Sequence, residues 1–157
     1  MEVKRHQERN ILEKLRRIAI DRMQGYGYQL VVPPMVEYLE SMVEGVGKDL
    51  ELQTFKLIDQ ISGRTLGVRA DFTPQVARID SQRLDTDGIS RLCYAGSVLH
   101  ASTNQPFGDR EILQVGAEIY GHRGLESDVE IQLLTVDVIK QAGAGKVCLD
   151  IGHVDIF

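Results

Sequence analysis

The sequence has few cysteines and no long apolar run. Its two cysteines, Cys93 and Cys148, stand singly inside apolar, strand-like segments, with no CxxC or Cys/His spacing. This spacing indicates neither a zinc site nor a disulfide framework, and we expect buried thiols in a reducing cytoplasm. No apolar run approaches the roughly 18 residues of a membrane span, and the N-terminus has no apolar signal region. The sequence therefore predicts an unsecreted protein with no membrane segment.

The charges of the chain are mixed in sign, and familiar catalytic motifs are missing. The 18 basic and 23 acidic residues are mixed along the chain and give a formal net charge of -5. Such a chain has no basic field that would attract nucleic acid. The motifs GxGxxG, P-loop and GxSxG are absent, and the four histidines show no metal-ligand spacing. We predict no metal, no cofactor and no nucleic-acid partner, so any chemistry must come from side chains on a sheet.

The chain has the length and patterning of one α+β domain. Its 157 residues, 43% of them hydrophobic, have no obvious linker or repeat, and a domain of this size buries roughly 68–70% of its unfolded surface. An apolar stripe that ends at Gly25 predicts an amphipathic helix. Runs of apolar, β-branched and aromatic residues predict strands over 28–32, 91–99, 112–120 and 147–151, and a hairpin over 54–69. We therefore expect an antiparallel sheet flanked by helices over residues 1–157.

Two further helices are indicated by their first residues. Thr73 and Pro74 have the residue types of an N-cap and a first helical position. Ser127 and Glu130 match a capping box ahead of a helix so apolar that it must be covered on most sides.

The run I-L-Q-V-G-A-E-I-Y-G, residues 112–121, carries an unusual polar face. Alternation places Leu113, Val115, Ala117 and Ile119 on a core face and leaves Gln114, Gly116 and Glu118 on the other. A glycine between two polar residues lets a ligand lie close to the backbone. The alternative is a solvated sheet face with a bulge, which spacing alone favours because antiparallel sheets ordinarily alternate in this way. Arg69, Asp71, Thr73 and His100 follow neighbouring strand ends and are further candidates.

The two paired-strand segments carry a family resemblance. V-R-A-D-F-T-P-Q and the stretch from R-L-C-Y-A-G-S-V-L-H to I-L-Q-V-G-A-E-I-Y-G resemble the amino-acid-binding core of class II aminoacyl-tRNA synthetases, specifically histidyl-tRNA synthetase. The second stretch corresponds to motif 2 of that class. G-Y-G-Y-Q-L-V-V-P-P-M-V-E-Y and the helix before it resemble motif 1, which forms the dimer interface of the class. The pattern is most similar to the regulatory subunits of ATP phosphoribosyltransferase, through T-L-G-V-R-A-D-x-T-P-Q-V-A-R-I-D and L-D-I-G-H-V.

The resemblance implies a binding site for free L-histidine. In the synthetase a glutamate, a threonine, a glutamine and a second glutamate hold the substrate. Here Thr73, Gln114 and Glu118 match in type, and Asp71 replaces the first glutamate. The resemblance places Asp71, Thr73 and Gln114 around the ammonium group and Glu118 at the imidazole. Asp71 is one methylene shorter, so its contact is longer or passes through water.

Departures from the synthetase imply that catalysis is lost. His100 stands where the motif 2 arginine holds the ATP α-phosphate, and Gly108 stands where the synthetase has another arginine, although Arg110 matches. A neutral imidazole does not replace a permanently charged fork. Phe157 also precedes motif 3, and the chain begins later than the family does, so we expect a domain truncated at its C-terminus.

The resemblance therefore implies a non-catalytic regulatory subunit. Its expected partners are the short-form catalytic subunit of ATP phosphoribosyltransferase, which acts in histidine biosynthesis, L-histidine as feedback inhibitor, and a second copy bound through the motif 1-like segment, residues 11–34. The alternatives are a fragment of histidyl-tRNA synthetase and a stand-alone histidine-binding paralogue with another partner. An intramolecular core helix is the alternative for the motif 1-like segment.

Overall fold

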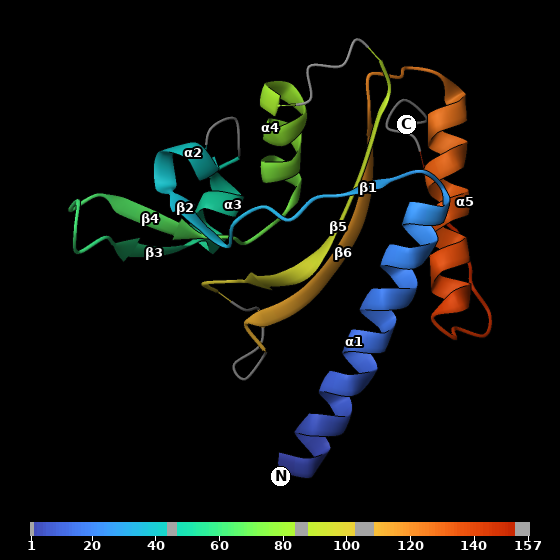
Figure 1. Ribbon diagram of the computed structural model, residues 1–157, viewed down its shortest axis with the longest axis horizontal. Helices are drawn as coiled ribbons and strands as arrows, with labels where there is room; N and C mark the ends of the chain where they lie inside the picture. The colour runs from blue at the N-terminus through green and yellow to red at the C-terminus, as the bar shows by residue number, and fades with distance from the viewer. Residues whose placement is uncertain (1, 44–46, 84–87, 103–108, 153–157) are drawn as a thin grey trace.

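The computed structural model describes residues 2–43, 47–83, 88–102 and 109–152, with the backbone alone for residues 2–6 and 83. As predicted, the fold is α+β (Figure 1). The elements are α1 (Glu2–Gly25), β1 (Gln29–Leu30), β2 (Val36–Tyr38), α2 (Leu39–Val43), α3 (Lys48–Gln53), β3 (Phe55–Ile58), β4 (Thr65–Val68), α4 (Thr73–Arg83), β5 (Ser90–Leu99), β6 (Glu111–Tyr120) and α5 (Leu125–Gln141).

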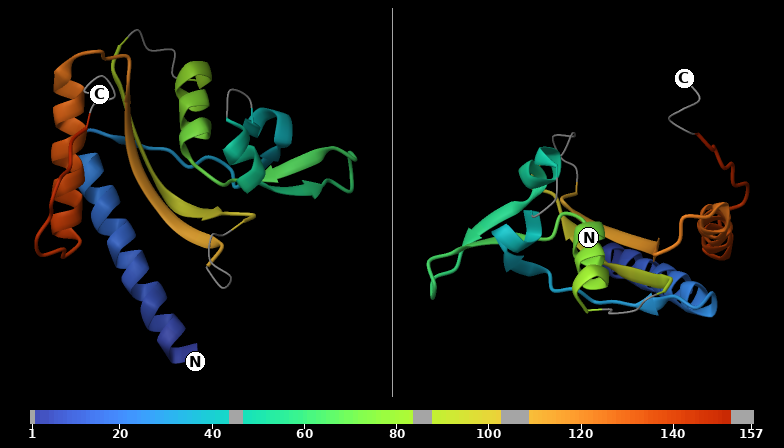
Figure 2. Two further views of the ribbon diagram at one scale, coloured as in Figure 1. Left: turned by 180° about the vertical axis from the view of Figure 1, so that it is seen from behind. Right: turned by 90° about the horizontal axis from the view of Figure 1, so that it is seen from above.

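The strands form two sheets. The large sheet has the order β1-β5-β6, in which β5 and β6 pair antiparallel along all ten residues of each strand and β1 pairs parallel to β5. The small sheet has the order β2-β4-β3 and is antiparallel throughout. It projects to one side of the large sheet, beside the short helices α2 and α3 (Figures 1 and 2). Both hairpins predicted from the sequence, β3–β4 and β5–β6, are confirmed.

Helices cover both faces of the large sheet (Figure 2). On one face α1 and α5 lie side by side, and their core contains Met23, Tyr28, Cys93 and Leu134. On the other face lies α4, and this second core contains Phe72, Val76, Leu92, Tyr94 and Val98. Leu92 and Cys93 enter different cores because successive strand residues point to opposite faces. The sheet is therefore the middle of three layers.

The first helix ends at Gly25, as the sequence predicts. Its C-terminal half packs through Ala19 and Met23, which are buried. Its N-terminal half extends beyond the sheet (Figure 1), and Ile11 there is 57% exposed. The apolar stripe is thus covered over only part of its length.

The C-terminal segment differs from the prediction. Residues 147–151 are not a strand, because none of the strands in the described part of the chain pairs with them, and Leu149 and Ile151 are exposed. Cys148 is exposed as well, so the expectation of two buried thiols is right for Cys93 alone. Strand β1 is also shorter than predicted and has only two paired residues.

The start and the surroundings of α5 were also predicted wrongly. The helix begins at Leu125 after Gly124, so Ser127 lies inside it and its hydroxyl donates to the Gly124 carbonyl at 2.8 Å. Glu130 does not close a capping box, because its carboxylate binds Arg91 of β5 instead. The helix is also not covered on most sides, because apolar residues on one side of it, including Leu133, are exposed.

Candidate functional site

The polar face of β6 points toward α4 and not toward open solvent. Gln114, Gly116 and Glu118 are half-buried and lie opposite Gly96, Tyr94 and Leu92 of β5. Directly opposed residues of an antiparallel pair share a face. Since Leu92 and Tyr94 belong to the core beneath α4, the polar residues border that core. This face is therefore half-buried against that core, and the described register between β5 and β6 runs without a bulge.

Three of the predicted residues meet at the start of α4. The Gln114 side-chain amide donates to Asp71 Oδ1 at 2.8 Å, and the Thr73 backbone N–H donates to the same oxygen at 3.1 Å. Gln114 Oε1 in turn accepts from the Phe72 backbone N–H at 3.2 Å. The helix begins at Thr73 itself, so the carboxylate of Asp71, and not the Thr73 hydroxyl, caps the first turn. A carboxylate is favourable there because it faces the positive end of the helix dipole.

Tyr94 completes the site, although the sequence reasoning missed it. Its ring stacks on Phe72, with 4.7 Å between ring centroids, and its hydroxyl lies 3.3 Å from Thr73 Oγ1. The ring also covers Gly116, where an added Cβ would lie 2.3 Å from the Tyr94 hydroxyl oxygen. The bare backbone at residue 116 thus makes room for a neighbouring side chain. The signal was available in part, because Tyr94 lies in the predicted partner strand of Gly116.

Glu118 lies beyond Tyr94 on the same face. Its Oε2 accepts from the Tyr120 hydroxyl, while its Oε1 is buried with no hydrogen-bond partner among the described residues. Burial raises the pKa of Tyr94 to about 12, and the nearby charges of Glu118 and Asp71 act in the same direction. Burial and the hydrogen bond to Glu118 also raise the pKa of Tyr120. Both phenols therefore stay protonated near neutral pH.

The assembled side chains are rich in acceptors. Two carboxylates, an amide oxygen and hydroxyls suit an ammonium group and a second N–H donor, because charge-assisted hydrogen bonds are the strong ones. Among the residues that the structure describes, no three His, Cys, Asp or Glu side chains are placed to hold a metal ion.

The remaining candidates serve the fold. His100 Nε2 lies 3.1 Å from the Ala70 carbonyl oxygen, so the ring ends its strand with a local hydrogen bond. Arg69 is 5% exposed and donates to the carbonyls of Pro33 at 2.9 Å and Ser97 at 2.8 Å. Its guanidinium lies over the Phe72 ring, 3.6 Å from the centroid, and burial lowers its pKa. Gly108 lies outside the described residues.

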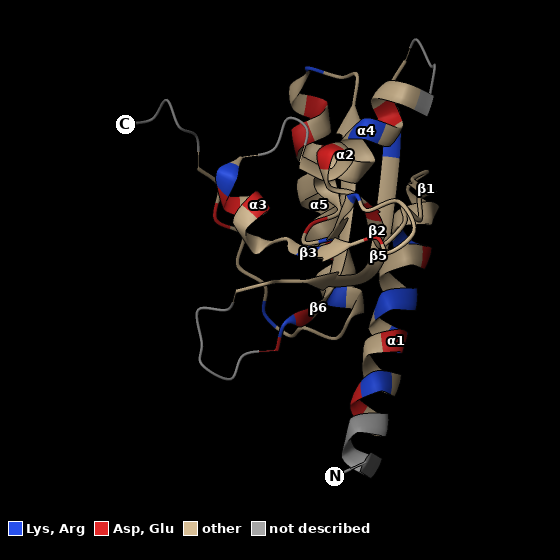
Figure 3. Cartoon of the chain, turned by 90° about the vertical axis from the view of Figure 1, so that its left-hand side faces the viewer, with Lys and Arg blue, Asp and Glu red and all other residues tan. Residues whose placement is uncertain are grey.

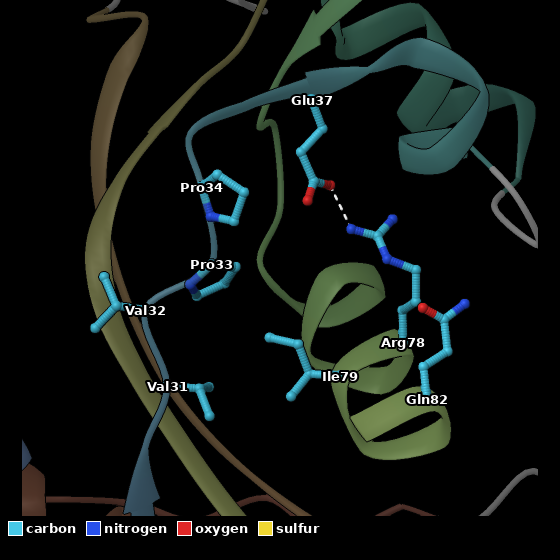
Figure 4. A pocket seen from close by; sticks show the side chains of 8 residues that line it. All are labelled: Val31, Val32, Pro33, Pro34, Glu37, Arg78, Ile79 and Gln82. Carbon is cyan, nitrogen blue, oxygen red and sulfur yellow. Dashed lines mark hydrogen bonds and ion pairs between the residues drawn. The ribbon is translucent and has the colours of Figure 1, made fainter. Parts of the chain in front are cut away.

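Other surfaces of the molecule lie apart from these residues. A cavity of about 310 Å³ separates the segment Val31–Pro34 from α4, and an ion pair between Glu37 and Arg78 crosses its upper part (Figure 4).

On α1, basic and acidic positions are interleaved (Figure 3), and hydrogen bonds from Arg16 and Arg17 lower the pKa of Glu13 to about 2. No helix in the described part of the chain is long and apolar enough to cross a membrane.

The fold is that of a class II aminoacyl-tRNA synthetase-like core. The family model of histidyl-tRNA synthetase matches residues 3–157, and the chain belongs to this family. A curated protein of Paraburkholderia phymatum, named ATP phosphoribosyltransferase regulatory subunit, is 57% identical over 145 residues, which make up 92% of this chain and 38% of that protein. A protein of the same name from Ralstonia pickettii matches with the same identity and the same coverage. The chain thus spans well under half of the length of these relatives.

Solved structures agree with this assignment. A crystal structure from Bacillus halodurans, described as an ATP phosphoribosyltransferase regulatory subunit/histidyl-tRNA synthetase, has a TM-score of 0.70 at 32% identity and covers 85% of this chain and 35% of that one. A histidine–tRNA ligase subunit from Alicyclobacillus acidocaldarius has a TM-score of 0.71 at 20% identity and covers 87% of this chain and 39% of that one. The second likeness concerns the fold alone.

Proposed function

We propose that this chain is part of a non-catalytic, cytoplasmic regulatory subunit of ATP phosphoribosyltransferase that binds L-histidine. The observation that carries the proposal is the acceptor cluster at the start of α4, where Gln114 and the Thr73 backbone both bind Asp71 Oδ1. The names of the relatives from Paraburkholderia and Ralstonia support the regulatory role and a catalytic partner. In this proposal the partner is the short-form catalytic subunit, the first enzyme of histidine biosynthesis.

In this proposal the ammonium group of the ligand contacts the Asp71 carboxylate, and its imidazole contacts the Glu118 carboxylate. Its ammonium group donates to Asp71, the Thr73 hydroxyl and the Gln114 oxygen, and its imidazole N–H donates to Glu118 Oε1. That oxygen is buried and lacks a partner among the described residues, so a ligand donor removes the cost of an unmade hydrogen bond. Feedback follows when histidine binds two states of the complex unequally, and a coupling free energy of about 1–3 kcal/mol is sufficient.

The cluster lacks the group that amino-acid activation needs. A permanently charged fork stabilises the α-phosphate during adenylate formation, but position 100 holds a histidine bonded to the Ala70 carbonyl. We expect the full-length protein neither to exchange pyrophosphate into ATP with histidine nor to charge tRNA. A histidine-dependent exchange rate would instead support the alternative that the family match allows, a histidyl-tRNA synthetase fragment.

The motif 1-like segment is proposed to form a homodimer. Ala19 and Met23 on its helix are buried within the chain, so the dimer interface would be formed by the exposed part of this segment. That part includes Ile11 on α1 and Val32, which is 83% exposed. These apolar side chains, exposed in the single chain, would be covered in such a dimer. Light scattering at micromolar concentration should give twice the monomer mass, and a monomeric mass would contradict the proposal.

Calorimetric titration of the full-length protein with L-histidine tests the site. Glu118→Ala should weaken binding about 5- to 150-fold, corresponding to roughly 1–3 kcal/mol for an unpaired imidazole donor. Glu111→Ala is the matched control, because Glu111 lies on the same strand but on the opposite face. Equal affinities in both variants and the parent, or no binding to the parent, would reject the histidine site. Co-purification with the catalytic subunit separates the regulatory subunit from a stand-alone histidine-binding protein.

A further inference from the structure

Glu118 presents its two carboxylate oxygens unequally. Oε2 accepts the hydroxyl proton of Tyr120, and Oε1 is buried with no hydrogen-bond partner among the described residues. Tyr120 and Glu118 are both on β6 and are separated by one residue, so their side chains share a face of the strand. The pairing is therefore built into the strand itself and does not require a distant element.

Rings on both sides restrict the Glu118 carboxylate. The Tyr120 ring is half-buried and packs against the core formed by Phe72, Val76, Leu92, Tyr94 and Val98. On the other side the Tyr94 ring stands over Gly116 and is held by its stack on Phe72, with an interplanar angle of 7°. The packed Tyr120 ring therefore brings its hydroxyl to Oε2, and that oxygen is the one that the phenol engages.

We propose that Tyr120 is a positioning residue that sets the specificity of the site, because its hydroxyl competes for Glu118 Oε2 and leaves Oε1 as the carboxylate oxygen with no partner among the described residues. This inference rests on the proposed function, because it concerns the ligand side chain at the same site. An imidazole donates one N–H in one direction and satisfies one oxygen. A guanidinium binds a carboxylate through two parallel N–H groups and needs both oxygens. With Oε2 already accepting from Tyr120, the second guanidinium N–H competes with the phenol for that oxygen, so arginine binds more weakly than histidine.

The experiment removes the Tyr120 hydroxyl and compares two amino acids. Full-length Tyr120→Phe, which keeps the packed ring, is titrated calorimetrically with L-histidine and with L-arginine. The ratio of the arginine Kd to the histidine Kd should fall by about 5-fold or more relative to the parent, because Oε2 becomes available to the second N–H. Tyr26→Phe is the control, since Tyr26 lies on the connection after α1 and belongs to neither core. It should leave the ratio unchanged.

The ratio separates positioning from a structural role. If Tyr120 only supported the fold, both affinities would fall together and the ratio would stay at the parental value, which would overturn the inference. Tyr120→Met also lacks the hydroxyl and should shift the ratio in the same direction, and an unshifted ratio in that variant would contradict the role given to the hydroxyl. A parent that binds histidine with an unshifted ratio in both variants rejects this inference and leaves the proposed function standing. A parent that binds no histidine rejects both.

Discussion

The two sheets are built from similar alternating sequences but are covered very differently. In the large sheet Leu92 is 1% exposed, because α4 covers one face and α1 with α5 covers the other. In the small sheet Leu57 of β3 is 47% exposed, and Ile61 in the β3–β4 turn is almost fully exposed. Alternation thus predicts a strand in both places, but the layers around the strand decide whether its side chains are fixed. The candidate site lies in the covered sheet, where its carboxylates are held in place.

The largest expected difference between the sheets concerns truncated leucines. Leu92→Ala should lower the free energy of unfolding by about 2–5 kcal/mol, because it leaves a cavity in a close-packed core. Leu57→Ala removes the same atoms from a half-exposed position and should cost at most about 1 kcal/mol. Urea unfolding of the two variants measures both values. Equal losses would mean that the small sheet is as well covered as the large one.

An added methyl group tests the packing of each sheet. In Gly116→Ala the new Cβ meets the Tyr94 ring, which is buried and stacked, so we expect a loss of about 1–3 kcal/mol together with weaker histidine binding. In Gly67→Ala the nearest atom is the sulfur of Met42 at 2.9 Å, and a methionine side chain can repack. That variant should lose less than about 1 kcal/mol. Thermal unfolding gives the ranking, and the reverse order would contradict this account of Gly116.

The smallest expected effect is the pH dependence of the ion pair that joins the large sheet to α5. Hydrogen bonds from Arg91 hold the pKa of Glu130 below its usual range. A lowered carboxylate pKa stabilises the fold above the unfolded-state value near 4.3, and this stability is lost as the pH falls through the folded-state value. Glu130→Gln should therefore cost about 0.5–1 kcal/mol at pH 7, since both partners are partly exposed. The cost should shrink below about pH 4.

The control for this prediction lies beside the small sheet. Glu40 pairs with Arg64 on the surface, and both side chains are largely exposed. The hydrogen bond from Arg64 lowers the pKa of Glu40 as well, but water screens this exposed pair, so Glu40→Gln should shift the unfolding midpoint less than Glu130→Gln does. A pH-dependent cost in this variant equal to that of Glu130→Gln would remove the distinction between the two regions.

The sequence predicts the elements of the site better than their contacts. Period-two patterning identifies β5 and β6, and the placement of Gln114 and Glu118 on one face follows from it. The structural role of Tyr94 does not follow, because the sequence contains no register and therefore does not show that Tyr94 lies opposite Gly116. The meeting of Asp71 with Gln114 depends on tertiary packing across 43 positions of the chain. The family resemblance supplied that association where periodicity could not.

The wrong predictions share a physical cause. An alternating run such as residues 147–151 has the composition of a strand, but a strand exists only when a neighbour pairs with its backbone. No described strand does so, and Cys148 is exposed for the same reason. The capping-box pattern at Ser127 and Glu130 is likewise a local signal. The capping box does not form, because Glu130 makes a bidentate ion pair with Arg91 instead.

The unequal pairing within the large sheet implies an order of assembly. Strands β5 and β6 are neighbours in the chain, whereas Gln29 of β1 meets Leu92 only after about 60 residues have been looped out. Contacts that close short loops are entropically cheaper and form sooner, so the β5–β6 hairpin should precede the docking of β1. Two paired residues also hold β1 weakly. In native-state hydrogen exchange the amides of β1 should therefore open at lower free energy than those at the centre of β5.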